Sequence, residues 1–196
     1  MNMQIRLPDS TNSIVENYSM VNDSTGKYWY HLKPRFPDSH PTLYKKIISG
    51  AERSIRIWDP HIHENKDCVI FTEVKNNIAI EILTLKSLNG THANFMTSFV
   101  NEMQKVIPVE KSVSFCLGVI DKYTNKEWEF HDRFLIIDRN QVYLVGGSVE
   151  YNHTSKMGSG IYKVTDTTTS QFIIDLFAKY WNETIKLPET IQLLHP

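Results

Sequence analysis

Strand-like and helix-like segments alternate along the chain from about residue 40, and this alternation constrains the fold more than any other feature. The stretch SIRIWDP alternates as a strand does, IAIEILTL is rich in apolar and β-branched residues as a buried strand is, and SVSFCLGVI is the next predicted strand. The stretches KDCVIFTEV and THANFMTSFVNEMQKV lie between them, and the second carries apolar residues at helical spacing. The sequence therefore predicts helices packed on a sheet.

The last third of the chain contains clustered strands and one long helix. A hairpin pattern at 129–148 is followed by SGIYKVTD and then by TTTSQFIIDLFAKYWNE. The helix has a single apolar stripe, which we predict to be core or a dimer contact. The stripe consists of Phe172, Ile173, Leu176, Phe177, Tyr180 and Trp181. Strands that alternate with helices early and cluster late predict an α/β fold, with one mixed β-sheet flanked by helices on both faces.

The length of 196 residues fits one compact domain with a full core, which we place at residues 41–188. Residues 1–40 are rich in Asn, Ser, Asp and Pro, and their aromatic pieces predict an N-terminal extension with an edge strand packed on the core. Residues 189–196 are expected to form a C-terminal tail.

The compartment is predicted from two features. The N-terminus has no apolar run typical of a signal peptide, and no segment approaches the roughly 20 apolar residues of a spanning helix. Cys68 and Cys116, the only cysteines, lie far apart in apolar surroundings, which favours reduced core thiols over a disulfide or a zinc site. We therefore expect a soluble, cytoplasmic protein.

The charge of the chain is nearly balanced. Lys and Arg number 21 against 22 Asp and Glu, so no global field attracts nucleic acid or an anionic membrane, and any anion binding must be local. One basic segment, LYKKIISGAERSIR, has charges that suit a phosphate backbone, although we prefer a solvated helix face. Its cations are Lys45, Lys46, Arg53 and Arg56.

Charged residues interrupt the apolar hairpin EFHDRFLIIDRNQVYLVGGS at residues 129–148, where Arg139 and Asn140 are predicted to supply the turn. Residues two apart in a strand share a face, so His131 and Arg133 project together. A core histidine is the alternative for His131, but its neighbours favour a binding site.

The residues of this hairpin suit a phosphate group. A guanidinium grips phosphoryl oxygens, and an imidazole attacks phosphorus or moves a proton near neutral pH. At the end of the hairpin, Gly146 and Gly147 let the backbone pass close to a ligand, and Ser148 offers a hydroxyl. Asp138 is predicted to orient the imidazole or to balance local charge.

A second polar stretch, DPHIHEN, follows the first predicted strand. Asp59 is predicted to support the site from the end of that strand, with an ordinary Asp-Pro turn as the alternative. His61 and His63 share one face, as a metal pair would, but no third ligand is evident. We therefore predict no metal site.

The pattern His-x-Arg-x4-Asp followed by Gly-Gly-Ser resembles the signature of the phospholipase D superfamily, His-x-Lys-x4-Asp with a downstream Gly-Ser. The match covers His131, Asp138, Gly147 and Ser148, with Arg133 where the family usually has lysine. The order of predicted elements over about residues 40–185 also resembles one phospholipase D-like half. IWDPHI, FHDRF and FIIDLFAKYW are similar, in addition, to the phospholipase D-like C-terminal domain of MIT-domain proteins, a membrane-binding dimer with a degraded active site.

The resemblance implies a mechanism that needs no cofactor or metal. A chain with one motif homodimerises, His131 of one subunit forms a phosphohistidine, and His131 of the other protonates the leaving oxygen. Arg133 and Ser148 hold the phosphoryl oxygens. Three departures weigh against turnover: the arginine itself, Glu150 where the family pattern has asparagine, and a longer interval between Asp138 and Gly147.

The preferred function is a homodimeric, metal-independent phosphodiesterase, more specifically a nuclease with nucleic acid as substrate. Analogy alone places it in a bacterial defence or toxin-like system. The alternative is a catalytically degenerate phospholipase D-like module that binds a phosphorylated ligand, a membrane headgroup or a protein partner. A third hypothesis, a sensor domain for a sugar or nucleotide, lacks an attached DNA-binding segment.

Overall fold

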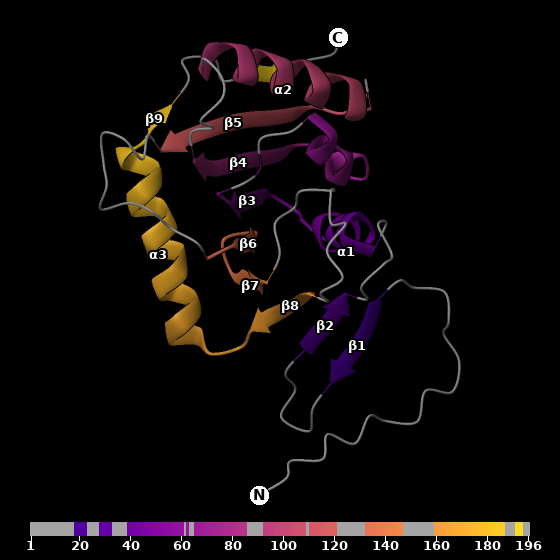
Figure 1. The fold of residues 1–196 in the computed structure, drawn as a ribbon, viewed down its shortest axis with the longest axis vertical. Coiled ribbons are helices and arrows are strands. Elements are labelled where there is room, and N and C mark those ends of the chain that lie inside the picture. Colours follow the sequence, from indigo (N-terminus) through magenta and orange to yellow (C-terminus); the bar gives the residue numbers. More distant parts are fainter. Residues whose placement is uncertain are drawn as a thin grey trace, which may run out of the picture.

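The computed structural model describes residues 18–22, 28–32, 39–60, 62, 65–85, 92–108, 110–120, 132–146, 159–186 and 191–193. Within these residues ten strands form one sheet, in the order β1-β2-β8-β7-β6-β3-β4-β5-β10, with β9 paired to β5 (Figure 1). Three α-helices and one 3-10 helix pack on the sheet. No helix in this described part is both long enough and apolar enough to span a lipid bilayer.

The strands are β1 Tyr18–Asn22, β2 Tyr28–Leu32, β3 Ser54–Trp58, β4 Ile78–Leu85, β5 Val113–Ile120, β6 Phe134–Ile137, β7 Gln141–Val145, β8 Ser159–Val164, β9 Ile185–Lys186 and β10 Ile191–Leu193. The helices are α1 Ser39–Ile48, the 3-10 helix η1 Asn65–Phe71, α2 His92–Val106 and α3 Thr167–Glu183. The strands and helices predicted from the central part of the sequence are thus confirmed.

The sheet is mixed, as predicted. β3, β4 and β5 run parallel, with Trp58 opposite Leu83, whereas β6 pairs antiparallel with β3, with Trp58 opposite Phe134. The hairpin of β6 and β7 continues through β8 to β2 and β1, all antiparallel. β1 and β2 lie within residues 1–40 and extend the sheet past β8, while β10 pairs with β5.

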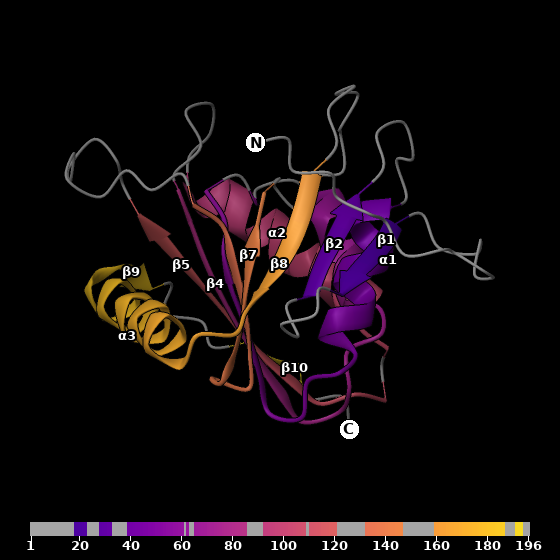
Figure 2. The same ribbon diagram turned by 90° about the horizontal axis from the view of Figure 1, so that it is seen from below.

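Helices cover both faces of the sheet, which confirms the predicted fold class. Figure 2 shows α1 and α2 on one side and α3 on the other. The alternation of strand side chains builds two cores: Ile55 and Ile57 of β3 face the α1, η1 and α2 side, whereas Trp58 faces α3. Consecutive residues of β3 are therefore all buried, since each face has a helical layer over it.

The apolar stripe of α3, predicted to be core or a dimer contact, is core in its centre and exposed at one position. Ile173, Phe177 and Trp181 are buried against the sheet at helical spacing. Phe172, in contrast, is 63% exposed and lies outside the core. Its Cα is one residue, or about 100°, away from the buried line, so its side chain points past the edge of the contact.

Candidate functional site

The polar residues of the hairpin lie at two opposite ends of the sheet. Arg133 directly precedes β6 and Asp138 directly follows it. The four residues of β6 lie between them, and the five steps from Cα to Cα span about 17 Å at about 3.4 Å per residue. The sequence predicted that Arg133 and Asp138 act in one site, but the structure places these two residues at opposite ends of β6. His131, Gly147, Ser148 and Glu150 lie outside the described residues.

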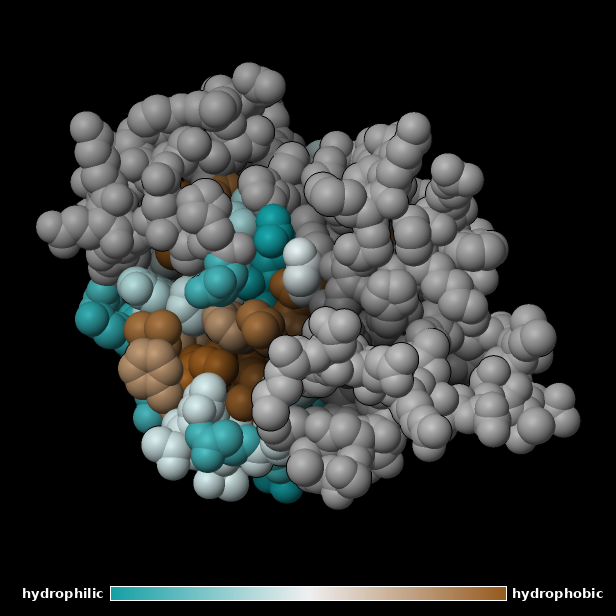
Figure 3. Space-filling model, turned by 60° about the horizontal axis from the view of Figure 1, so that its bottom comes forward, coloured by the Kyte–Doolittle hydropathy of each residue, from teal (hydrophilic) through white to brown (hydrophobic). Residues whose placement is uncertain are grey.

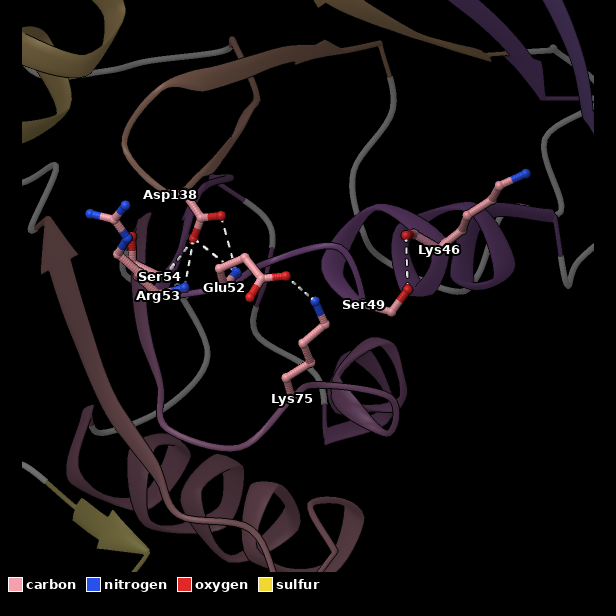
Figure 4. A network of polar contacts seen from close by, with 7 residues as sticks. All are labelled: Lys46, Ser49, Glu52, Arg53, Ser54, Lys75 and Asp138. Atoms are coloured by element: carbon pink, nitrogen blue, oxygen red, sulfur yellow. Dashed lines mark hydrogen bonds and ion pairs between the residues drawn. The ribbon is translucent and has the colours of Figure 1, made fainter.

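The Asp138 carboxylate binds the backbone that leads into β3, as Figure 4 shows. Its Oδ1 atom accepts hydrogen bonds from the N–H groups of Glu52, Arg53 and Ser54 at 3.1, 2.7 and 3.0 Å. Its Oδ2 atom accepts a second bond from Glu52 at 3.0 Å. The N–H of Asp138 donates in return to the carbonyl oxygen of Ser54 at 2.9 Å. The residue therefore fastens the hairpin to the start of the central strand.

The turn itself uses left-handed backbone at two residues other than glycine. Asp138 has φ of 53° and Arg139 has φ of 60°, and the N–H of Asn140 donates to the carbonyl oxygen of Ile137 at 3.1 Å. The turn comprises residues 138–140, so it contains Arg139 and Asn140 as predicted and Asp138 in addition. Aspartate is among the few residues that tolerate this region, and the bonds to β3 offset the remaining strain.

Two opposing effects act on the pKa of the Asp138 carboxyl. Burial is the largest single effect and raises it. The backbone N–H groups of Ser54, Arg53 and Glu52 lower it, with help from the positive charge of Arg53. The pKa is lowered overall from its ordinary value of 3.8, so the carboxyl is ionised at neutral pH. An ionised group suits acceptance of several N–H bonds.

At the other end of the sheet, the structure brings Asp59 and Arg133 together. Asp59 directly follows β3 and is only 1% exposed. Its Oδ1 atom lies 3.7 Å from Nε of Arg133. The antiparallel register of β3 and β6 explains the contact, because Trp58 pairs with Phe134 and the next pair in line is Asp59 with Arg133. The buried position of Asp59 beside Arg133 gives the predicted support of the site a physical basis, and the alternative, an ordinary Asp-Pro turn, is compatible with the turn at Pro60.

Thr84 lies beside this pair and was not predicted as a site residue from the sequence. The N–H of Asp59 donates to the carbonyl oxygen of Leu83 at 3.0 Å, so the parallel ladder continues to place Thr84 beside Asp59 on the same face of the sheet. The Thr84 side chain is fully buried, and its hydroxyl has no hydrogen-bond partner in the described part of the chain. A threonine near the end of the apolar run IAIEILTL was the only sequence signal.

Gly146 leaves the sheet at the same end. The N–H of Val145 donates to the carbonyl oxygen of Arg133 at 2.9 Å, and Gly146 follows β7 as an exposed residue. We call Arg133, Asp59, Thr84 and Gly146 the strand-end site. It lies at the carboxyl ends of the parallel strands β3 and β4, the position where open α/β sheets commonly bind ligands.

The strand-end site combines a cation with a buried anion. The Asp59 carboxylate holds the Arg133 guanidinium by charge, and Arg133 is partly exposed, so it is accessible to an incoming phosphate. Among the described residues no group of three His, Cys, Asp or Glu side chains has a geometry that suits a metal ion. His61 and His63 lie outside those residues.

The predicted basic segment does not form one surface. Arg56 is 7% exposed, and its Nε atom lies 2.5 Å from Oε2 of Glu81 on the neighbouring strand. Its guanidinium also lies 5.1 Å from the ring centroid of Phe177. Both interpretations, a phosphate footprint and a solvated face, are therefore wrong for Arg56. A strand residue under α3 is buried whatever its polarity.

Comparison with known proteins identifies the fold. No protein-family model and no curated protein matches the sequence. Among solved structures, NucT from Helicobacter pylori is similar over 82% of this chain and 98% of its own, with a TM-score of 0.54 and 15% identity. Nuc from Salmonella typhimurium, a phospholipase D family member, is similar over 83% of this chain and 99% of its own, with a TM-score of 0.49 and 13% identity. The chain has the same fold as NucT, and this agrees with the fold class predicted from the sequence.

Proposed function

We propose that the protein is a metal-independent phosphodiesterase that cleaves nucleic acid as a homodimer. One observation carries the proposal: Arg133, Asp59 and Gly146 meet at the carboxyl ends of the central strands in a phospholipase D-like fold. His131 stands two residues before Arg133 in the sequence and Ser148 two residues after Gly146. Both residues are therefore close in sequence to residues of the strand-end site.

The proposed chemistry proceeds in two displacements. The imidazole of His131 attacks phosphorus, a P–N bond forms, and the P–O bond to the leaving group breaks while His131 of the second subunit protonates the leaving oxygen. A water molecule then attacks phosphorus, the P–N bond breaks, and the second histidine accepts the proton of the water. Arg133 stabilises the negative oxygens in both steps, and Asp59 keeps the guanidinium in place.

The dimer is proposed because one chain carries one such motif. An apolar surface near the strand-end site supports it: Leu144 of β7 is 40% exposed and pairs with Phe134, the neighbour of Arg133. On the face that Figure 3 shows, apolar side chains gather in one area with hydrophilic side chains above and below it. Light scattering at assay concentration tests the proposal, since a strictly monomeric protein is incompatible with paired histidines.

The decisive experiment is cleavage of labelled single- and double-stranded DNA and RNA, and of bis-p-nitrophenyl phosphate, in buffer with EDTA. We expect the wild type to cleave and His131→Ala to be inactive. Asp132→Ala is the matched control, because Asp132 is the exposed neighbour in the same segment. Activity that survives in His131→Ala excludes the phosphohistidine mechanism.

A second function, a noncatalytic phosphate-binding module, is favoured by one feature. The charge of Arg133 is already balanced by Asp59. Arginine binds phosphate well, but it gives up a proton less readily than lysine does. If no substrate is cleaved, this module becomes the preferred function. It predicts that bis-p-nitrophenyl phosphate binds to the wild type and to His131→Ala but not to Arg133→Met.

A further inference from the structure

A groove of about 670 Å³ lies at the end of the sheet opposite to the strand-end site. It is formed by the β6–β7 turn, the end of β8 and the first turns of α3. Its volume is in the range of ligand-binding pockets, about 300–1,000 Å³. We call it the turn groove.

The turn groove has a positive lining. Arg139 and Lys163 contribute cations, and no carboxylate is among the described residues that line it. Three acids stand next to lining residues in the sequence, and each carboxylate accepts from a donor; that of Asp175 accepts from Nε2 of the lining residue Gln171 at 2.8 Å. Asp138 accepts from the backbone before β3, and Asp166 accepts from the N–H of Thr169 at 2.7 Å. The lining itself therefore carries two cations and no carboxylate, in a chain whose net charge is −1.

One of the two cations is held in a fixed position. Nζ of Lys163 donates to Oε1 of Gln141 at 2.9 Å and lies 5.7 Å from the ring centroid of Tyr143. These contacts come from β7, the strand next to the lysine on β8. A preorganised lysine loses less conformational entropy when it binds an anion.

The helix side of the turn groove is polar where a helix usually packs with apolar residues. Thr167, Ser170, Gln171 and Ile174 lie on one face of α3 at helical spacing, and three of these four side chains are polar. One turn later α3 buries Phe177 against the sheet. The helix side of the turn groove is thus polar, with the Ser170 hydroxyl donating to the carbonyl oxygen of Val164 at 3.3 Å and the Gln171 amide donating to Oδ1 of Asp175 at 2.8 Å.

We propose that the turn groove binds the phosphate backbone of a nucleic acid at a distance from the point of cleavage. Lysine, arginine, hydroxyl and amide groups are the side chains that contact phosphate and sugar oxygens without reading sequence. No aromatic side chain lines the turn groove among the described residues, so stacking on bases is not expected there. Nucleic acid as the ligand rests on the proposed function.

The separation of the two sites determines how the inference is tested. Asp138 and Arg139 follow β6 and Arg133 precedes it, so about 17 Å of strand lies between the turn groove and the strand-end site. A small phosphodiester reaches only one of them. An extended strand reaches both, and its affinity then includes a salt-dependent contribution from each cation.

The experiment measures binding of a labelled single-stranded DNA of about 20 nucleotides by fluorescence anisotropy between about 50 and 200 mM salt, in EDTA. Lys163→Gln and Arg139→Gln are each expected to weaken binding about 3- to 10-fold at low salt and to reduce the salt slope by about 0.7. Lys163→Arg is expected to restore binding. Lys179→Gln, which removes an exposed cation of α3 outside the turn groove, is the control.

Hydrolysis of bis-p-nitrophenyl phosphate separates this inference from the proposed function. Variants of the turn groove are expected to hydrolyse it at the rate of the wild type. If both variants bind the oligonucleotide as Lys179→Gln does, the inference is overturned. If no substrate is cleaved but the two variants still bind DNA more weakly than the control, the turn groove stands and the proposed function fails.

Discussion

Asp59 and Arg133 form an ion pair in which one partner is far more buried than the other. The Asp59 side chain is 1% exposed and that of Arg133 is 21% exposed, with 3.7 Å between Oδ1 and Nε. A buried charge that loses its counter-ion is costly, because water does not reach it to replace the lost interaction. Replacing Arg133 and replacing Asp59 are therefore expected to change the free energy of unfolding by different amounts.

We expect Arg133→Met to lower the free energy of unfolding by about 2–4 kcal/mol, because the charge of buried Asp59 loses this partner. Asp59→Asn is expected to cost less, about 1–2 kcal/mol, since the partly exposed guanidinium regains water. Urea unfolding of the two single variants and of the double variant shows which replacement costs more stability and measures the coupling energy between Arg133 and Asp59. Equal costs that add in the double variant contradict an ion pair at this place.

Asp138 makes stability depend on pH. Its pKa is lower in the folded chain than the ordinary value of 3.8, so folding favours the ionised form. The resulting stabilisation is complete above the unfolded value and is lost as pH falls from about 4 through the folded pKa. Asp138→Asn is expected to flatten the acid limb of a plot of unfolding free energy against pH. Asp132→Asn, an exposed carboxylate in the same hairpin, is the control.

Replacing Asp138 by glycine separates backbone strain from hydrogen bonding. Glycine adopts the φ of 53° without strain, which favours the variant by about 1 kcal/mol. It also removes the hydrogen bonds that the carboxylate accepts from the N–H groups of residues 52–54, at about 0.5–1.5 kcal/mol each. We therefore expect a net loss in thermal unfolding. A more stable Asp138→Gly shows that strain, not the contact with β3, dominates at this turn.

Sequence patterns predicted the central architecture because local residue types dictate it. IAIEILTL and the Ile173, Phe177, Trp181 line each carry their own periodicity, and they became β4 and the buried face of α3. The contact of Asp138 with Arg53 spans 85 residues, so no local pattern encodes it. The motif indicated a catalytic carboxylate, and only the sheet order revealed that the residue sits at the opposite end from Arg133.

The burial of a charged residue in the sheet could also not be predicted from sequence patterns. Arg56 alternates with isoleucines in SIRIW, which is typical of a strand with one solvated face. Once α3 covers that face, the arginine is buried and needs Glu81 from the next strand. The strand-end site was predicted in part: Asp59 and Arg133 were chosen from their residue types, while Thr84 resembled the rest of an apolar strand and was found only through its register with Asp59.

Two buried or half-buried threonines are expected to respond in opposite directions to replacement by valine. The Thr84 hydroxyl has no hydrogen-bond partner in the described part of the chain, so Thr84→Val removes a buried polar group and is expected to leave stability unchanged or to raise it by about 1 kcal/mol. The Thr72 hydroxyl donates to the carbonyl oxygen of Val69 at 3.1 Å, so Thr72→Val is expected to cost about 0.5–1.5 kcal/mol. Chemical denaturation compares them. A large loss in Thr84→Val indicates that its hydroxyl has an essential partner, and Thr84→Ser then restores stability.

Gly118 of β5 allows α3 to approach the sheet at its carboxyl end. A Cβ atom at this position would lie 2.8 Å from Cζ3 of Trp181 and 3.0 Å from Oγ1 of Thr184, closer than carbon and oxygen atoms pack. Gly118→Ala is therefore expected to lower the free energy of unfolding by about 1–3 kcal/mol through overpacking. Combining it with Trp181→Phe removes the clashing ring atoms, so the double variant should lose less than the two single variants together. Thermal unfolding of the four proteins measures this coupling; simple additivity excludes a direct contact between Gly118 and the indole.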